Sequence, residues 1–342
     1  MKILVIGGTG FVGSFVVRAF LKSDHDVTVY NRGSANSLPE GVRRIVGARD
    51  SLREKTSELR RLAPDVVVDT ILSSARQAAE LMEVFQGAAG RVIVLSSQDV
   101  YRAYGILVGL EQIPLQAVPI TEESALRTRL RPYSREQTTR MRDVFPWLDD
   151  EYEKIEVERI VTGDESLPAT IVRLPMVYGP GDPLHRFYPI VKRVDDKRPA
   201  IFLPRNAADW RPSRGYVENV AAAIALATTS ERATSQVYNI AELTAYSELE
   251  WTRLIASSAS WDGEVITLEP QATPAHLRVL FNTDQDLVAS TKRIRSELGF
   301  KEPVPIGEGI RRTIEWERAN PPKQIDSDPF DYAAEDAARL VF

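Results

Sequence analysis

Short apolar runs alternate with stretches of helical periodicity through the first half of the chain. The runs are rich in β-branched residues and predict strands, in the order KILVI, DVTVY, RRIV, DVVVD and RVIVLSS. Residues 14–22 and 76–85 lie between such runs and place apolar side chains at the spacing of an amphipathic helix. Because strands that alternate with helices form right-handed crossovers, the pattern predicts a parallel sheet with helices on both faces.

The second half of the chain is patterned differently. A long polar stretch fills residues 102–149, which we interpret as an insertion, and a helix is expected to begin near Asp149. Beyond Gly179 the density of proline and glycine rises, and strand-like runs are separated by helices such as VENVAAAIAL. The sequence therefore predicts an α/β protein, with a Rossmann-type doubly wound parallel sheet and a smaller C-terminal substrate lobe.

The expected domain boundaries follow these changes in pattern. Residues 1–178 are predicted to form mainly the Rossmann domain, and residues 179–320 mainly the substrate-binding lobe, with segments that return to the core. The last stretch, 321–342, is an acidic tail that ends in a short amphipathic pattern. The tail is either docked on the protein, which we favour, or available to bind a partner.

Composition narrows the classes of chemistry. The chain has 48 acidic and 43 basic residues for a net charge of −5, a mild balance that disfavours a nucleic-acid partner and shows no membrane-binding field. The absence of cysteine excludes disulfides, thiolate nucleophiles and thiolate zinc sites, and three scattered histidines give no reason to expect a metal site. The start MKILVIGG lacks the features of a signal peptide, and we expect a cytoplasmic protein.

A glycine-rich turn, GGTGFVG, follows the first predicted strand and opens the first predicted helix. Glycines at positions 7, 10 and 13 permit a tight turn, let the backbone approach a pyrophosphate and bring the helix close to the sheet. The helix N-terminus adds free N–H groups and the positive end of its dipole. We therefore predict a dinucleotide site, whose contacts include Gly7, Thr9, Gly10, Phe11, Val12 and Gly13.

The residues after the second strand predict which dinucleotide binds. An NAD site carries an acidic side chain here for the ribose 2′-hydroxyl, whereas this chain has Asn31 followed by Arg32. An arginine can neutralise a 2′-phosphate, so the sequence favours NADP over NAD. Asp50, in a loop after the third strand, is a candidate to hold the adenine amino group.

These motifs resemble the extended short-chain dehydrogenases/reductases, the NAD(P)-dependent epimerase/dehydratase family. The likeness covers nearly the whole chain and includes GGTGFVG, LSSQDVY, PITEESALRTRLRPY, VRLPMVYGPGD, RGYVENVAAAI and TKRIRSELGF. It implies hydride transfer on a nucleotide sugar or another small carbonyl compound, and a homodimer formed through two helices of each subunit. It also implies that Arg211 and Arg214 contact a nucleotide diphosphate.

The family's catalytic residues match only in part. Its usual members have a tyrosine, a lysine four residues later and a nearby serine, so that lysine and tyrosine share one helix face. Ser97 matches the serine, and Lys154 with Glu158 matches the lysine and its following KxxxE pattern. The tyrosine position then falls on Asp150, which is expected to pair with the lysine and cannot act as a phenolic acid.

Two tyrosines compete for the missing role. Tyr152 precedes Lys154 by two residues, roughly 200° around an ideal helix, and serves only if it lies in an irregular first turn. Tyr133, in RPYSREQ, matches a PYxxxK motif whose lysine is replaced by Gln137. A motif split by the insertion would bring Tyr133 near Lys154 in space, so both tyrosines are candidates.

The insertion is also rich in arginine. These side chains either grip a substrate phosphate or, as we favour, form the solvated face of a helix. They are Arg127, Arg129, Arg131, Arg135, Arg140 and Arg142.

Two functional hypotheses follow. In the first, the protein is an oxidoreductase that reduces or epimerises a sugar-nucleotide-like or carbonyl substrate: Ser97 orients the oxygen, a tyrosine is the acid/base, and Lys154 holds the ribose and lowers the tyrosine pKa. In the second, Asp150 marks an atypical member that binds NAD(P) without ordinary dehydrogenase chemistry, as a cofactor sensor or RNA-associated protein.

Overall fold

The computed structural model describes residues 1–342 except 34–37, 113, 324–329 and 340–342. Its centre is a seven-stranded sheet in the order β10-β6-β5-β4-β1-β2-β3, in which every neighbouring pair is parallel. The strands are β1 (Lys2–Ile6), β2 (Asp26–Asn31), β3 (Arg43–Val46), β4 (Val66–Asp69), β5 (Arg91–Ser97), β6 (Ala169–Leu174) and β10 (Val237–Asn239). The strand order reverses between β1 and β4, which confirms the predicted doubly wound Rossmann-type sheet.

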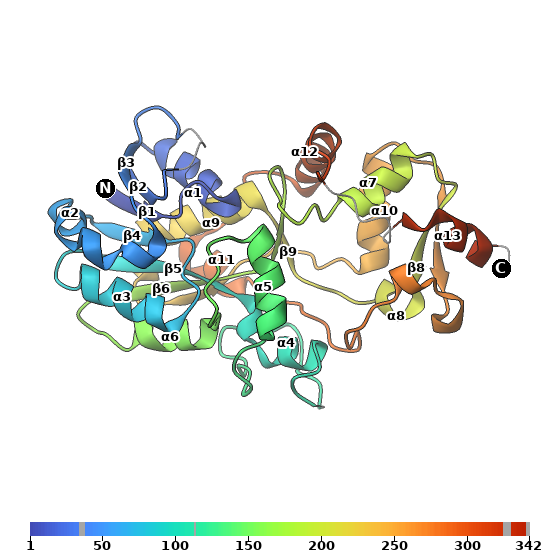
Figure 1. Ribbon diagram of the computed structural model, residues 1–342, viewed down its shortest axis with the longest axis horizontal. Helices are drawn as coiled ribbons and strands as arrows, with labels where there is room; N and C mark the ends of the chain where they lie inside the picture. Colours follow the sequence, from blue (N-terminus) through green and yellow to red (C-terminus); the bar gives the residue numbers. More distant parts are fainter. Residues whose placement is uncertain (34–37, 113, 324–329, 340–342) are drawn as a thin grey trace.

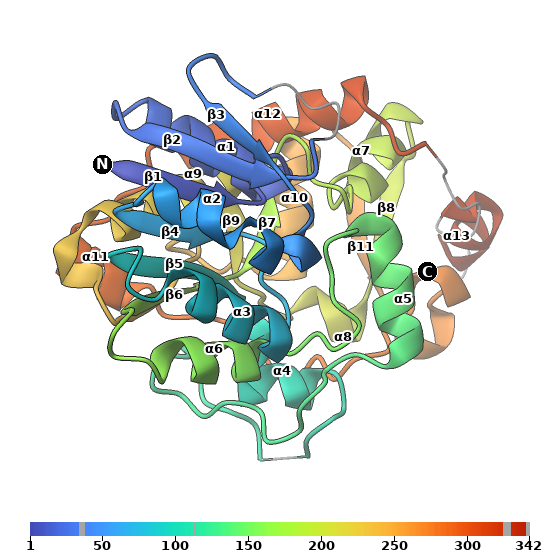
Figure 2. The ribbon, with the colours of Figure 1, turned by 60° about the vertical axis from the view of Figure 1, so that its left-hand side comes forward.

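Both faces of the sheet are covered, which explains why its strands are apolar throughout. In β1, Ile3 and Val5 join one core cluster, and Leu4 and Ile6 join a second cluster on the opposite face. Figure 2 shows the helices on the two sides of the sheet. The first cluster includes α1 (Phe11–Leu21), α9 (Val217–Thr229) and α11 (Lys292–Leu298), and the second includes α2 (Thr56–Arg61), α3 (Ala75–Phe85) and α6 (Lys154–Thr162).

A smaller lobe lies beside the sheet (Figure 1). Its elements are α7 (Tyr188–Asp195), β8 (Ala200–Pro204), α8 (Arg205–Ala208), α10 (Glu248–Ser258) and β11 (Glu264–Leu268), with β8 and β11 paired in parallel. A second parallel pair, β7 (Met176–Tyr178) and β9 (Arg214–Tyr216), and helix α12 (Ile306–Ala319) lie between the lobe and the sheet. Single 3-10 turns are η1 (Arg49–Ser51), η2 (Arg53–Lys55), η3 (Gln98–Val100), η4 (Glu231–Ala233), η5 (Pro270–Ala272) and η6 (Ala275–Leu277).

The insertion contains two helices, α4 (Arg102–Leu107) and α5 (Arg135–Val144). Helix α5 begins with a capping box, in which the Ser134 hydroxyl accepts from the N–H of Gln137 and the Gln137 side chain accepts from the N–H of Ser134. Gln137, which stands at the lysine position of the PYxxxK motif, is thus part of the capping box of α5. The helix expected near Asp149 begins five residues later, at Lys154, because the intervening segment is bound to the loop after β4.

The C-terminal helix α13 (Tyr332–Arg339) lies against the smaller lobe. Glu335 is fully buried and pairs with Arg193 of α7 and with Nε2 of His276, 3.0 Å from its Oε1. Ala338 joins a small apolar cluster with Phe202 and Leu268. In the described part of the chain, no helix is both long and apolar enough to cross a bilayer.

The Glu335→Ala substitution is expected to release α13 while the central sheet stays intact. Removing one partner of a buried ion pair costs about 3–5 kcal/mol, because the other charge is left buried and unpaired. Hydrogen exchange followed by mass spectrometry should therefore show faster exchange in residues 332–339 only. Asp336→Ala is the matched control, because this neighbour is 56% exposed and pairs with Arg198 at the surface. Unchanged exchange in Glu335→Ala would contradict this role for the buried pair.

Candidate active site

The glycine-rich turn is as closely packed as its sequence suggested. Gly7 has φ of +87°, and a Cβ there would lie 2.6 Å from the side chains of Ile71 and Thr70. A Cβ on Gly13 would lie 2.5 Å from the carbonyl oxygen of Gly7. Gly10 is the N-cap of α1 and makes no side-chain cap hydrogen bond. A backbone cradle at a helix N-terminus fits a dinucleotide pyrophosphate.

The other predicted turn residues lie around this cradle. Phe11 and Val12 begin α1 and pack against the core cluster, and Thr9 Oγ1 accepts a hydrogen bond of 3.3 Å from Asn31 Nδ2. Asn31 also accepts from the N–H of Gly33 at 3.0 Å, so its amide ties the end of β2 to the glycine turn. Arg32, the next residue, is exposed at the carboxyl edge of the sheet.

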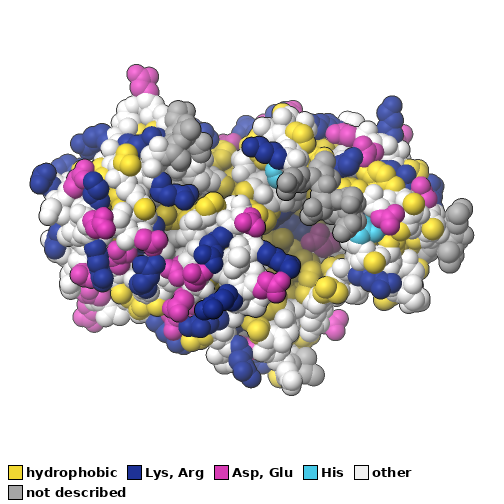
Figure 3. Space-filling model, in the orientation of Figure 1, with side chains coloured by type: hydrophobic (Ala, Val, Ile, Leu, Met, Phe, Trp, Pro, Cys, Tyr) yellow, Lys and Arg dark blue, Asp and Glu magenta, His cyan; other side chains and the backbone are white. Residues whose placement is uncertain are grey.

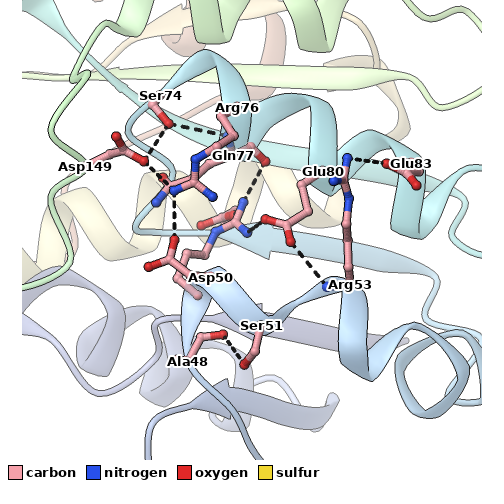
Figure 4. Close-up of polar contacts among 12 residues, drawn as sticks. Ala48, Asp50, Ser51, Arg53, Ser74, Arg76, Gln77, Glu80, Glu83 and Asp149 are labelled. Atoms are coloured by element: carbon pink, nitrogen blue, oxygen red, sulfur yellow. Dashed lines mark hydrogen bonds and ion pairs between the residues drawn. The ribbon is translucent and has the colours of Figure 1, made fainter.

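Asp50 lies at the same edge but pairs with an arginine of α3. Arg76 donates to Asp50 Oδ1 at 2.9 Å and to Asp149 Oδ2 at 2.7 Å (Figure 4). The Asp50 side chain is 71% exposed, so a bound adenine would compete with Arg76 for it. Arg76 thus connects the expected adenine side of the site to the segment before the catalytic helix.

Lys154 is the first residue of α6 and lies inside the site. It is 4% exposed, and its Nζ donates to the carbonyl oxygens of Leu72, after β4, and of Leu95, in β5, the latter at 2.8 Å. Burial lowers the pKa of Lys154 to about 8, against the opposing effect of the charges of Asp99, Asp69 and Glu158. The ammonium therefore lies at the carboxyl edges of β4, which is the neighbour of β1, and of β5.

Tyr152 lies before α6 rather than on it, so the helical spacing that separated it from Lys154 does not apply. Glu153 is the N-cap, and the Lys154 ammonium lies 5.8 Å from the centre of the Tyr152 ring. The Tyr152 hydroxyl donates to Asp99 Oδ2 at 2.7 Å, and the nearby Ser97 side chain lowers the pKa of Tyr152 against the larger opposing effects of burial and of Asp99. Ser97, Tyr152 and Lys154 are therefore brought together.

Tyr133 reaches the same carboxylate from the insertion. Its hydroxyl donates to Asp99 Oδ2 at 3.4 Å and accepts from the hydroxyl of Tyr104 at 3.0 Å. Its ring lies 5.5 Å from that of Tyr152. Removal from water and the charge of Asp99 raise the pKa of both Tyr133 and Tyr152 well above the usual value, so both phenols are neutral.

Hydrogen bonds from the loop after β4 hold the segment that carries Tyr152. The N–H of Asp149 donates to Ser73 Oγ, and the N–H of Glu153 donates to the Ser73 carbonyl oxygen, both at 3.0 Å. Ser74 donates to Asp149 Oδ2 at 3.0 Å (Figure 4). These bonds hold residues 149–153, which include a turn at Asp150 and Glu151, beside the site until α6 begins.

A buried ion pair closes the other side of this segment. Arg127 and Glu153 both have fully buried side chains, with Arg127 Nη2 3.1 Å from Glu153 Oε1. Glu153 also accepts from the N–H groups of Ile155 and Arg131. Arg127 Nε donates to the main-chain oxygen of Asp99, so one guanidinium links the insertion, the cap of α6 and the end of β5.

Asp150 is not where the family's helical spacing suggested. It lies in a turn before α6, has a side chain that is 63% exposed, and pairs with Arg142 of α5. The expected ion pair between Asp150 and Lys154 is therefore wrong, because the helix begins after both Asp150 and Tyr152. Asp99 is the carboxylate next to the tyrosines.

Glu158, four residues into α6, lies in a buried network behind the site. It forms a two-pronged pair with Arg173 of β6, at 3.0 and 2.7 Å, and accepts from Ser96 at 2.5 Å. Arg173 also donates to the hydroxyl of Tyr101, which itself donates to Asn239. This network fixes α6 against β5 and β6, and hence the position of Lys154.

The remaining arginines of the insertion lie on the surface. Arg142 is partly buried, and the exposed ones are Arg129, Arg131, Arg135 and Arg140. Arg140 pairs with Glu136, Arg142 with Asp150, and Arg131 with Glu151. Figure 3 shows Lys and Arg side chains interspersed with Asp and Glu on the face that carries α5, which is the pattern of a solvated surface.

Both arginines expected at the substrate diphosphate have acidic partners from α10. Arg214 is 8% exposed, pairs with Glu248 and lies 4.9 Å from the ring of Trp251. Arg211 has a side chain that is 42% exposed and lies 2.9 Å from Glu250. Of the two, Arg211 is the more accessible to a ligand.

Sequence reasoning missed Asp99, Tyr104 and the buried pair of Arg127 with Glu153. For Asp99 a signal was present: it follows Ser97 by two residues, at the carboxyl end of a strand where parallel sheets carry their ligand contacts. For Arg127 no local signal existed, because its partners are 26 and 28 residues away along the chain.

Known proteins share this architecture. The sequence profile of the NAD dependent epimerase/dehydratase family matches residues 3–241. A 2′-dehydrokanamycin reductase of Streptomyces kanamyceticus is 36% identical over 126 residues, which cover 36% of this chain and 32% of that protein. A dTDP-glucose 4,6-dehydratase of Salmonella typhimurium is 23% identical, covering 94% of this chain and 93% of that protein.

The solved structures agree in fold. A UDP-glucose 4-epimerase of Thermotoga maritima, crystallised with UDP-glucose, is 18% identical, covers 93% of this chain and 99% of its own, and has a TM-score of 0.65. At this identity the likeness establishes the fold and leaves the reaction open. The extent of the profile match, together with the glycine turn and the sheet order, shows that the chain belongs to the NAD dependent epimerase/dehydratase family.

Proposed function

We propose that this protein is an NAD(P)-dependent oxidoreductase that moves a hydride to or from a carbon of a sugar-nucleotide-like or carbonyl substrate, giving reduction or epimerisation. One observation carries the proposal: Ser97, Tyr152 and Lys154 converge at the carboxyl edge of β5, next to the glycine turn. Convergence of a hydroxyl, a phenol and an ammonium is what polarising an oxygen and moving its proton require.

Each side chain has a separate task. The bound dinucleotide supplies the hydride acceptor or donor. Ser97 and Tyr152 hydrogen-bond the reacting substrate oxygen, and Tyr152 gives or takes its proton. Lys154 lies under the strand ends, where its ammonium can bind the ribose hydroxyls of the cofactor. The glycine turn at the N-terminus of α1 holds the pyrophosphate.

NADP is the favoured cofactor. Asn31 leaves the end of β2 without the carboxylate that would repel a 2′-phosphate, and Arg32 is exposed beside it. For the substrate, Arg211 is the accessible cation in the lobe, and the Thermotoga relative was crystallised with UDP-glucose. A cytoplasmic homodimer completes the proposal and rests on the family resemblance.

One observation favours a second candidate, a protein that binds the cofactor without ordinary turnover. Lys154 donates to two main-chain carbonyls, and Tyr152 donates to Asp99, so both polar groups already have partners inside the protein. An enzyme must exchange these bonds for bonds to its ligands. Turnover measurements on site variants separate the two candidates.

Replacing Tyr152 by phenylalanine is expected to lower kcat by about 10²–10⁴-fold, the usual contribution of a general acid or base. Tyr133→Phe is the comparison variant, because it removes the other hydroxyl that binds the same carboxylate, and a smaller loss of kcat is expected from it. Turnover is followed by nicotinamide absorbance with a panel of nucleotide sugars and small carbonyl compounds, and cofactor binding by calorimetry. A greater loss in Tyr133→Phe would assign the acid/base to that residue, and tight cofactor binding without turnover of any compound would favour the second candidate.

Arg32→Ala is expected to weaken NADPH binding by about tenfold or more, since a hydrogen bond to a charged group contributes about 1.5–3 kcal/mol. NADH, which lacks the 2′-phosphate, should bind the variant and the wild type equally. Arg43→Ala serves as the control, because this exposed arginine pairs with Asp26 at the opposite edge of the sheet. Equal losses for both cofactors would contradict a role in cofactor choice.

Cofactor affinity should fall as the pH rises above about 8. The pKa of Lys154 is lowered to about 8, so the ammonium keeps its charge below that pH and loses it above, along with its attraction for an anionic dinucleotide. The expected decrease is up to about tenfold, equivalent to one pKa unit of coupling. Calorimetry at pH values below and above 8 should show that cofactor affinity falls with pH in wild type and in the control Lys22→Met. In Lys154→Met the affinity should be weak and independent of pH. A slope that survives in Lys154→Met would exclude Lys154 as its source.

A further inference from the structure

Asp99 is a buried carboxyl group inside the catalytic cluster. It is 4% exposed and lies in η3, directly after β5. Its Oδ2 accepts from Tyr152 at 2.7 Å and from Tyr133 at 3.4 Å, whereas its Oδ1 accepts no hydrogen bond from any described residue. Burial raises the pKa of Asp99, with opposing contributions from Tyr152, Arg127 and Lys154. The group is therefore poised to take up a proton.

The charged groups around Asp99 balance one another. Arg127, from the insertion, binds the main-chain oxygen of Asp99 and the carboxylate of Glu153. Lys154, from α6, contributes an attractive charge and Glu153, its N-cap, a repulsive one. Among the described residues the side chains that directly contact the Asp99 carboxylate are phenols, so proton exchange with a phenol is the chemistry open to it.

This arrangement differs from a tyrosine activated by a lysine. There, the ammonium lowers the phenol pKa until a phenolate forms. Here, the charge of Asp99 and its hydrogen bond both raise the pKa of Tyr152, so a resting phenolate is disfavoured. A neutral phenol bound to a carboxylate can still act as a base, because it can take a proton at oxygen while it releases its own to the carboxylate.

We propose that Asp99 accepts and donates the reaction's proton through the hydroxyl of Tyr152. Asp99 is thus a positioning residue, and Tyr152 is the group that touches the substrate. The inference rests on the reaction proposed above. In alcohol oxidation the substrate C–H electron pair leaves as hydride to the oxidised nicotinamide, and the substrate O–H proton passes to the Tyr152 oxygen. The Tyr152 proton passes to Asp99 Oδ2, and the substrate C=O bond forms. Carbonyl reduction reverses each step.

The hydroxyls of Tyr133 and Tyr104 extend this route toward the surface. Tyr104 donates to Tyr133, which donates to Asp99, and both tyrosines are partly exposed. Once Asp99 is protonated, reversing the direction of these hydrogen bonds carries the proton outward. Asp99 is thereby returned to its basic form for the next turnover.

Asp99→Asn separates the two mechanisms, because they predict opposite results. If Asp99 relays the proton, the amide, which keeps the shape but is not basic, lowers kcat for alcohol oxidation about 10²–10⁴-fold, and activity recovers only as the pH is raised enough to ionise Tyr152. If the ordinary lysine–phenolate mechanism operates, removing the negative charge lowers the Tyr152 pKa and raises activity at neutral pH. Asp99→Glu should restore part of the activity and the wild-type shape of the pH profile, and Asp143→Asn, an exposed carboxyl on α5, should change neither.

A second measurement does not depend on turnover. Tyrosinate absorbance during a pH titration should show phenols that ionise at lower pH in Asp99→Asn than in wild type, because the charge of Asp99 raises the pKa of both Tyr152 and Tyr133. The part of this change that is lost in the Asp99→Asn, Tyr152→Phe double variant belongs to Tyr152. Calorimetric cofactor binding confirms that each variant is folded, and Asp99→Ser, which also lacks a carboxylate, replaces Asp99→Asn for both measurements if the amide does not fold. If no compound turns over, the proposed function fails; unchanged tyrosine ionisation in Asp99→Asn overturns the coupling of Asp99 to Tyr152 whether or not a compound turns over. If compounds turn over, a neutral-pH rate in Asp99→Asn equal to or above wild type overturns the inference and leaves the proposed function standing.

Discussion

The active site depends on one buried ion pair, Arg127 with Glu153. Both side chains are fully buried, and neither charge could remain there without the other. Glu153 is also the N-cap of α6, so the pair determines where the helix begins. Through its bond to the main chain of Asp99, Arg127 connects the insertion to the end of β5. The insertion is therefore a structural part of the site, not a loop added beside it.

This constraint explains how Ser97, Tyr152 and Lys154 lie close together without the family's spacing. In its usual members a helix turn places the tyrosine and the lysine on one face. Here α6 begins only at Lys154. Tyr152 is positioned by the preceding segment, residues 149–153, which is hydrogen-bonded to Ser73 and ends at Glu153, the N-cap of α6. Hydrogen bonds between segments distant in sequence thus do what the helical i, i+4 spacing does in the usual family members: they keep the tyrosine and the lysine close together.

The same distinction explains what the sequence could predict. The strands, the glycine turn and the order of helices follow from local patterns, because burial on both faces imposes apolar runs and a close turn imposes glycine at positions 7 and 13. Lys154 and Ser97 were proposed because they match the family's KxxxE pattern and its serine at the end of a strand. Asp150 was misplaced because helical spacing was applied to residues that precede the helix. Arg127 and Tyr104 could not be found, since their partners are distant in sequence and meet only after folding.

The cluster contains two buried cations, Arg127 and Lys154, and two buried anions, Asp99 and Glu153, so its charges balance before any ligand binds. In the proposed relay Tyr152 takes the substrate proton as it gives its own to Asp99, so Tyr152 stays neutral and no second negative charge enters the interior. A phenolate at the same place would put a second negative charge within a hydrogen bond of the first, which burial makes costly. In this protein the negative charge lies on a carboxylate that is one hydrogen bond away from the neutral phenol. The pair of Tyr152 and Asp99 can therefore act as an acid when Asp99 is protonated and as a base when it is not. Reversible hydride chemistry requires both states, and Oδ1 of Asp99, which accepts no hydrogen bond from the described residues, stabilises the ionised form less than a fully bonded carboxylate would.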